Sequence, residues 1–192
     1  YPEKVCVVSA ILTKATTNQY YTSKYKNLSD NCLIMDKKIG LFWLRDDFRI
    51  VKNDGLCEAT KNHDEVVVFY LYKEETYKEQ EAQKWWLSKS LENFQKKLNT
   101  LNINLEIIET NSFKFFFDNL MKKKDFKIYW NKVYEPNYLK FDEYLLNNLN
   151  KKNILFKRFR GNALNEIDEI KKSDGTPFKV FTPFWKNAEK YY

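Results

Sequence analysis

The chain has 192 residues, a mass of 23.3 kDa and a net charge of +7, with 43% hydrophobic and 31% charged residues. This length allows one ordinary folded domain, and no apolar run reaches the roughly 20 residues of a membrane-spanning helix, so we expect a cytoplasmic protein with no membrane partner. Four scattered glycines cannot form a Gly-rich phosphate-binding loop, and three separated cysteines with one histidine argue against a disulfide framework and a metal site.

The first 34 residues differ from the rest of the sequence. They show no sustained helical or strand periodicity, and residues 13–29 are mostly polar. Met35 is followed by three charged residues and then by the apolar run 39–44, a pattern typical of the start of a bacterial protein. We therefore expect residues 1–34 to be an upstream read-through or an unstructured leader, with a genuine N-terminal extension as the alternative.

Five short segments predict β-strands. The first two are continuous runs of β-branched and aromatic residues, which is typical of parallel strands buried on both faces, and three shorter candidates follow. In chain order they are residues 38–44, 65–71, 105–108, 127–130 and 154–159. His63 lies in the polar loop before the second segment, where we expect a solvated turn residue.

Amphipathic helices separate these strands. The clearest covers residues 82–101, and its apolar stripe recurs at alternating intervals of four and three residues: Leu87, Leu91, Phe94, Leu98 and Leu101. Ser112 can cap a second helix with a phenylalanine stripe, and Pro136 suits the first turn of a third. These stripes indicate core packing rather than a cofactor site.

The alternation of strands and helices predicts the fold class. Right-handed crossovers between successive strands give a parallel sheet with helices on both faces, and five strands fit one doubly wound α/β domain of the flavodoxin or Rossmann type. With the strand order 3-2-1-4-5, the order reverses between the first and fourth strands, and ligands bind beyond the carboxyl ends of the strands at that point. We therefore expect residues 45–49 to lie close to residues 131–137.

Three stretches of the sequence are more specific than the fold. Residues 42–49 read FWLRDDFR, residues 129–136 read YWNKVYEP with Asp142 six residues on, and residues 174–186 read DGTPFKVFTPFWK. In this order and at this spacing they resemble the N-terminal α/β domain of the DNA photolyase/cryptochrome family. The resemblance covers roughly residues 38–186.

The three stretches match the family pattern to different degrees. The third matches the run G-x-P-(Y/F)-K-V-F-T-P-F almost letter for letter, and the second keeps the Asn…Tyr-Glu-Pro pattern. The first departs from W-F-R-R-D-L-R at three positions, Leu44, Asp46 and Phe48.

The resemblance implies a light-driven enzyme that repairs pyrimidine dimers in damaged DNA. The N-terminal domain of such an enzyme holds an antenna chromophore, methenyltetrahydrofolate or 8-hydroxy-deazaflavin, and passes excitation to FAD in a separate C-terminal helical domain. On this basis residues 35–176 are the antenna domain and residues 177–192 begin the linker to the FAD domain. The chain alone, which we expect to be a monomer, would bind no FAD and repair nothing.

The resemblance also assigns roles to individual residues, none of them catalytic. The family's Asn-Glu antenna pair falls on Asn137 and Tyr138, and the uncharged tyrosine leaves folate, deazaflavin, flavin or no antenna open. The expected antenna contacts are Asn137, Tyr138, Tyr134 and Arg45. The charged residues at 45–49 form either an ion-pair cluster or a contact with the antenna or a phosphate. The expected structural and domain-interface residues are Asp47, Arg49, Glu135, Phe181, Thr182, Pro183 and Phe184.

Two other functions fit the same residues. A cryptochrome is a light sensor that signals through partners and repairs nothing, and the N-terminal domain does not separate it from a repair enzyme. A stand-alone nucleotide- or flavin-binding module would leave residues 179–186 without a role. Lys157, Arg158 and Arg160 bracket the fifth strand, and we expect them on a solvated surface rather than against a DNA backbone.

Overall fold

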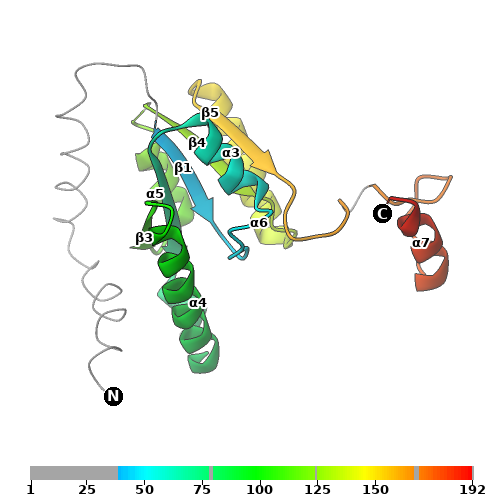
Figure 1. Cartoon of the computed structure of the whole chain (residues 1–192). Helices are drawn as coiled ribbons and strands as arrows, with labels where there is room; N and C mark the ends of the chain where they lie inside the picture. The colour runs from blue at the N-terminus through cyan, green and yellow to red at the C-terminus, as the bar shows by residue number, and fades with distance from the viewer. Residues whose placement is uncertain (1–38, 78–79, 124, 167–168, 192) are drawn as a thin grey trace.

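The computed structural model describes residues 39–77, 80–123, 125–166 and 169–191 (Figure 1). The expected leader at residues 1–34 lies outside these described residues. Five parallel strands form one sheet in the order β3-β2-β1-β4-β5, which confirms the predicted doubly wound fold. The strands are β1 (Ile39–Leu44), β2 (Val66–Tyr72), β3 (Asn104–Glu109), β4 (Phe126–Asn131) and β5 (Leu155–Phe159).

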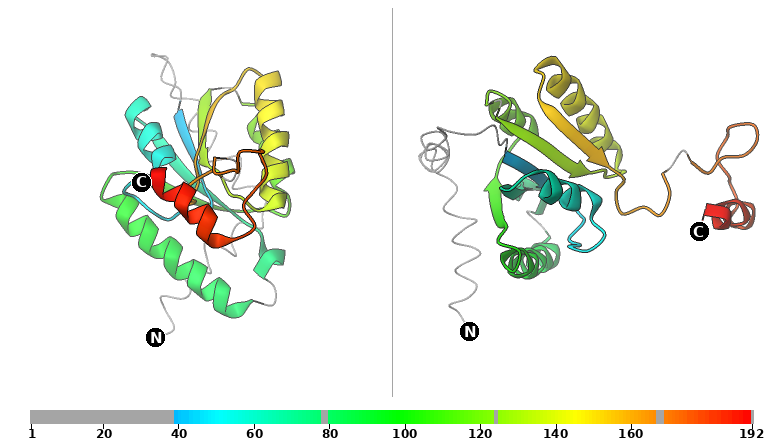
Figure 2. Two further views of the ribbon diagram at one scale, coloured as in Figure 1. Left: turned by 90° about the vertical axis from the view of Figure 1, so that its right-hand side faces the viewer. Right: turned by 45° about the horizontal axis from the view of Figure 1, so that its top comes forward.

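Helices cover both faces of the sheet, as the alternation of elements predicts (Figure 2). One face carries α3 (Asp54–Asn62) and α4 (Glu81–Asn99), and the other carries α5 (Phe113–Leu120) and α6 (Pro136–Lys151). The remaining elements are the 3-10 turns η2 (Glu74–Tyr77) and η3 (Glu189–Tyr191) and the helix α7 (Phe181–Ala188). Within the described ranges, no helix is long and apolar enough to cross a membrane.

The central strand contributes to two separate apolar cores because its successive side chains point to opposite faces. Leu41 and Trp43 of β1 pack toward α5 and α6, whereas Phe42 and Leu44 pack toward α3 and α4. All four side chains are buried. A strand in this position must therefore be apolar without interruption, which is the pattern that the sequence shows.

The helix ends agree with the sequence in two places and differ from it in a third. Ser112 caps α5, since its hydroxyl accepts the N–H of the residue three positions on at 3.3 Å, and Pro136 opens α6. The prediction that α4 extends to residue 101 is wrong. The helix ends at Asn99, the chain turns through Asn102 with a φ of 55°, and Leu101 is 50% exposed rather than part of the apolar stripe.

His63 is not the solvated turn residue that the sequence suggests. Its ring is half-buried, and its Nε2 lies 2.9 Å from the hydroxyl of Tyr129 in a hydrogen bond. A Cβ atom added at Gly40 would lie 2.8 Å from Cδ2 of His63, so the absence of a side chain on β1 makes room for the ring. The prediction failed because the loop before β2 folds back over β1 and β4, which only the sheet order brings together.

The helix α7 stands apart from the sheet, at the end of the segment that follows β5 (Figures 1 and 2). Its aromatic side chains face outward, with Phe181 70% and Trp185 46% exposed and their rings stacked at 6.1 Å. Exposed aromatic side chains that gather in this way form an apolar surface patch.

Candidate functional site

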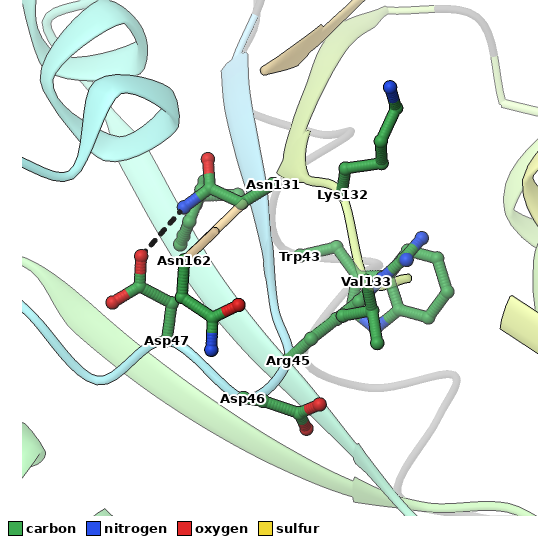
Figure 3. Close-up of a pocket in the computed structure, with 9 residues that line it drawn as sticks. Trp43, Arg45, Asp46, Asp47, Asn131, Lys132, Val133 and Asn162 are labelled. Carbon is green, nitrogen blue, oxygen red and sulfur yellow. Dashed lines mark hydrogen bonds between the residues drawn. The ribbon is translucent and has the colours of Figure 1, made fainter. Parts of the chain in front are cut away.

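The carboxyl ends of β1 and β4 meet at the point where the strand order reverses, and polar side chains gather there. Nδ2 of Asn131, the last residue of β4, donates to Oδ2 of Asp47 at 3.3 Å and to Oδ1 of Asn53 at 2.9 Å. Figure 3 shows Asn131 and Asp47 beside a small hollow together with Arg45. The structure thus confirms that residues 45–49 and the segment after β4 lie side by side.

The strongest electrostatic feature of this edge is a buried ion pair. Asp142, on α6, has no exposed surface and accepts a hydrogen bond from Nη2 of Arg45. The same carboxylate accepts from Nε1 of Trp130 at 3.2 Å and from Nη1 of Arg158 at 3.4 Å. Arg158 therefore contacts the buried carboxylate, which the expected solvated surface did not include, while 27% of its side chain remains exposed. A buried carboxylate is stable only with partners of this kind.

The guanidinium of Arg45 is enclosed between two aromatic rings. Its Cζ lies 3.9 Å from the ring centre of Trp43 and 5.3 Å from that of Tyr138. Burial lowers the pKa of Arg45, and the charge of Asp142 opposes this effect, so the group remains a cation. Nε and Nη1 of Arg45 have no hydrogen-bond partner in the described part of the chain. The arrangement places a positive charge directly behind the ring of Tyr138.

A second ion pair fixes the turn between β1 and α3. Nε and Nη2 of Arg49 donate to the two carboxylate oxygens of Asp47, both at 2.7 Å. Nδ2 of Asn53 donates to the carbonyl oxygen of Arg49 at 3.0 Å, and Oδ1 of Asn53 caps α3. The expected cluster at residues 45–49 is thus divided, because Arg45 pairs with α6 and only Asp47 and Arg49 pair with each other.

Asp46 lies between these two pairs and points away from Asn131 and Asp47 (Figure 3). The surrounding protein removes part of the water from its carboxyl group and Glu135 adds repulsion. Together these effects raise the pKa of Asp46 above its ordinary value of 3.8, against the opposing charge of Arg45. Although Asp46 is exposed, folding therefore makes its ionisation less favourable than it is in the unfolded chain.

Asp46→Asn is expected to raise the melting temperature at pH 7 by about 1–2 °C. When folding raises the pKa of a carboxyl group, the folded state loses stability as the pH rises and the group ionises. This loss disappears below pH 3.8, the ordinary pKa of the group, because the carboxyl is then protonated in both the folded and the unfolded state. Thermal unfolding at pH 7 and at pH 4 should show the gain shrinking at the lower pH. Asp125→Asn, in the loop before β4, is the control, and a lower melting temperature for Asp46→Asn at pH 7 would contradict the expectation.

Tyr134 ties the loop after β5 to the same edge. Its hydroxyl donates to Oε1 of Glu166 at 3.1 Å and accepts the N–H of Gly161 at 3.3 Å, while Nζ of Lys132 donates to Oε2 of Glu166 at 2.6 Å. A Cβ atom on Gly161 would lie 2.0 Å from the carbonyl oxygen of Lys132, so the close approach of this loop requires glycine. Partial burial raises the pKa of Tyr134. The polar atom of Tyr134 is engaged within the protein rather than directed to a ligand.

The other expected antenna residues lie at the start of α6. Glu135 and Asn137 are exposed, and Tyr138 is half-buried against Phe113 at 6.3 Å between ring centres. The hollow beside them measures about 10 Å³, which is room for about one water molecule. The hollow is therefore too small to enclose a flat ring of the size of a pterin or deazaflavin.

Three residues of the site were not assigned from the sequence: Asn53, Asn131 and Asp142. For Asp142 a signal was present, since it is four residues after Tyr138 and three before the buried Leu145, and it therefore shares the inward face of α6. A carboxylate on the apolar face of a helix requires a buried cationic partner. For Asn131 the predicted strand order was a signal, since it brings the end of β4 to residues 45–49, whereas no periodicity distinguishes Asn53.

The fold and this edge define the class of protein: a doubly wound α/β domain with its binding edge at the reversal of the strand order. The family model for DNA photolyase matches residues 40–192, and the chain belongs to this family. Two curated relatives are similar to it over most of its length. A deoxyribodipyrimidine photo-lyase of Agrobacterium fabrum is 26% identical over 149 residues, and Cryptochrome-2 of Arabidopsis thaliana is 30% identical over 157 residues.

Each match covers most of this chain but only a smaller part of the relative. The match to the photo-lyase includes 78% of this chain and 31% of the relative, and the match to Cryptochrome-2 includes 80% and 26%. A solved class III photolyase from Agrobacterium tumefaciens gives a TM-score of 0.70 at 23% identity, over 84% of this chain and 33% of that one. An archaeal photolyase from Sulfolobus tokodaii, solved with two FAD molecules, gives a TM-score of 0.66 at 20% identity. That match covers 79% of this chain and 35% of the archaeal one. The chain thus spans about a third of the proteins that it matches.

Proposed function

We propose that this chain is the antenna domain of a deoxyribodipyrimidine photo-lyase, a cytoplasmic, monomeric enzyme that splits pyrimidine dimers in DNA. Residues 35–176 form the antenna domain, and residues 177–192 begin the linker to a C-terminal helical domain that binds FAD. The match of the DNA photolyase family along residues 40–192 is the observation that carries this proposal. The exposed aromatic face of α7 supports it, because Phe181 and its neighbours then contact the second domain.

The antenna chromophore, methenyltetrahydrofolate or 8-hydroxy-deazaflavin, lies across the exposed start of α6. The residues fit such a group as an outer surface: Tyr138 offers the face of its ring, and the Asn137 amide can both donate and accept hydrogen bonds at a ring edge. The Arg45 guanidinium lies against the ring of Tyr138, and its ion pair with Asp142 keeps the guanidinium in that position. When bound, the chromophore absorbs light for the FAD, whose excited state supplies the electron that opens the dimer.

The remaining residues have structural roles in this proposal. Asp47 and Arg49 hold the turn after β1 in place, and Tyr134 holds the loop after β5, so both walls of the edge are rigid. No side chain is required to transfer a proton or to act as a nucleophile. Glu135, exposed beside Asn137, and Phe181 to Phe184 lie toward the second domain.

The test uses the full-length protein that carries this domain. We expect it to repair a DNA oligomer with one cyclobutane thymine dimer under blue light and not in the dark, and to show an antenna absorption band besides that of FAD. Tyr138→Ala should remove at least 80% of the antenna band and leave the FAD content unchanged, whereas Tyr144→Ala, on the same helix, should leave both. Loss of FAD together with the antenna, or an intact band in Tyr138→Ala, would overturn the assigned site.

A cryptochrome is the second candidate function. The observation that favours it is the 30% identity to Cryptochrome-2, which exceeds the 26% identity to the Agrobacterium fabrum photo-lyase. The same full-length protein distinguishes the two. Light-driven reduction of FAD without any dimer repair would assign the chain to a cryptochrome.

A further inference from the structure

Two adjacent tryptophans are exposed on α4, outside the site described above. Trp85 and Trp86 are 58% and 67% exposed, and their rings stack with 5.8 Å between the centres and 22° between the planes. The buried residues of this helix, all in its second half, are Leu91, Phe94 and Leu98. The first half of α4 therefore runs beyond the sheet and carries the tryptophan pair with it (Figure 1).

Two lysines beside this pair form ion pairs within the domain. Nζ of Lys84 donates to Oε1 of Glu74 at 2.7 Å, and Nζ of Lys89 donates to Oε2 of Glu92 at 3.3 Å. A platform for single-stranded nucleic acid combines aromatic rings with cations that are available to phosphates. With its neighbouring lysines engaged, this surface favours an apolar protein partner.

The position of the pair also limits its partner. Because α4 follows β2, its first half stands at the carboxyl edge of the parallel sheet, the edge that carries Arg45 and Tyr138. The chain leaves the sheet from β5 at the same edge before it reaches α7. Polypeptide that followed α7 would therefore start from the carboxyl edge at the β5 end of the sheet, and it would reach Trp85 and Trp86 by extending along that edge toward β3.

We propose that Trp85 and Trp86 form a docking surface for the C-terminal domain of the full-length protein, an inference that rests on the proposed function. The two indoles together expose roughly 300 Å², well below the roughly 800 Å² per partner of a stable interface between separate molecules. A small apolar surface suffices when its partner is tethered, because the linker supplies a high effective concentration. The chain spans 31% of the Agrobacterium fabrum photo-lyase, so a protein of that length has a large second part to place against this edge.

Hydroxyl-radical footprinting of the 192-residue chain and of the full-length protein tests this surface. Trypsin releases both tryptophans in one peptide, residues 85–89, so their oxidation is read together by mass spectrometry. We expect oxidation to be at least five-fold slower in the full-length protein. Leu101, exposed just beyond the other end of α4, is the internal reference and should react equally in both proteins.

Two results would overturn the proposal: equal oxidation of residues 85–89 in both proteins, or protection in the 192-residue chain that grows with its concentration and so indicates a second copy. The double variant Trp85→Ser/Trp86→Ser adds an independent measurement. It should speed tryptic cleavage between the domains of the full-length protein several-fold and leave the melting of the 192-residue chain unchanged, while Leu101→Ser changes neither. Repair and antenna absorption are measured separately, so failure of the proposed function is distinguishable from failure of this contact.

Discussion

Asp142→Ala is expected to lower the free energy of unfolding by about 3–5 kcal/mol, because it removes one partner of a buried ion pair. The carboxylate has no exposed surface, and Arg45, Trp130 and Arg158 all donate to it. Without it, the Arg45 guanidinium keeps its charge in a site where only 3% of its side chain is exposed. Urea unfolding followed by circular dichroism measures the loss.

Two further variants show whether the unpaired charge is the cause. Glu143→Ala, at the exposed neighbouring position of α6, should change the stability by less than about 0.5 kcal/mol. The double variant Arg45→Met/Asp142→Leu removes both charges and should recover most of the stability that Asp142→Ala loses, since apolar residues can replace a buried pair at little cost. A double variant less stable than Asp142→Ala would show that the network acts through its hydrogen bonds rather than its charges.

The strand order could be predicted from the sequence because it follows from general rules. Continuous apolar segments separated by amphipathic helices predict parallel strands with right-handed crossovers, and a five-stranded doubly wound domain of the Rossmann type has the order 3-2-1-4-5. Each predicted strand end lies within one residue of the observed one, as for β3, predicted over residues 105–108 and observed as Asn104–Glu109. The meeting of residues 45–49 with the end of β4 then followed from topology alone.

The contacts within the site depend on details that periodicity does not contain. Arg45 and Asp142 are 97 residues apart in the chain, and only the docking angle of α6 decides that they meet. The same angle places Tyr138 over Arg45 and leaves Asn137 exposed. The neighbouring charges at residues 45–49 suggested one local cluster. Arg45 pairs instead with Asp142 of α6, because that buried carboxylate has no water around it and needs a cationic partner.

These contacts change what the expected antenna residues can do. Arg45 is 5% exposed, so it cannot form the outer surface of a chromophore site and acts on a ligand only through the ring of Tyr138. Tyr134 uses its hydroxyl to hold the loop after β5. Asn137 is exposed and Tyr138 is half-buried at the start of α6, and we therefore place the proposed site on the first turn of that helix.

Trp43→Ala is the second substitution for which we expect a large loss, about 3–5 kcal/mol in the free energy of unfolding. The Trp43 indole is 2% exposed and contacts Phe113, Phe117 and Phe141 edge-on, with ring centres 4.7–5.8 Å apart. Its truncation leaves a cavity between β1 and the helices of that face. It also removes the ring that lies 3.9 Å from the Arg45 guanidinium, a contact that is strong when water is excluded.

The design of the experiment separates the cavity from the lost contact with the cation. Trp43→Phe keeps an aromatic face under Arg45 and should lose less than half as much stability in urea unfolding as Trp43→Ala. Trp86→Ala removes an indole of the same size that is 67% exposed and should change the stability of the 192-residue chain by less than about 0.5 kcal/mol. If Trp43→Ala lost no more than Trp86→Ala, Trp43 would not be the centre of this core. In that case only the ion pair with Asp142 would hold Arg45 against the ring of Tyr138.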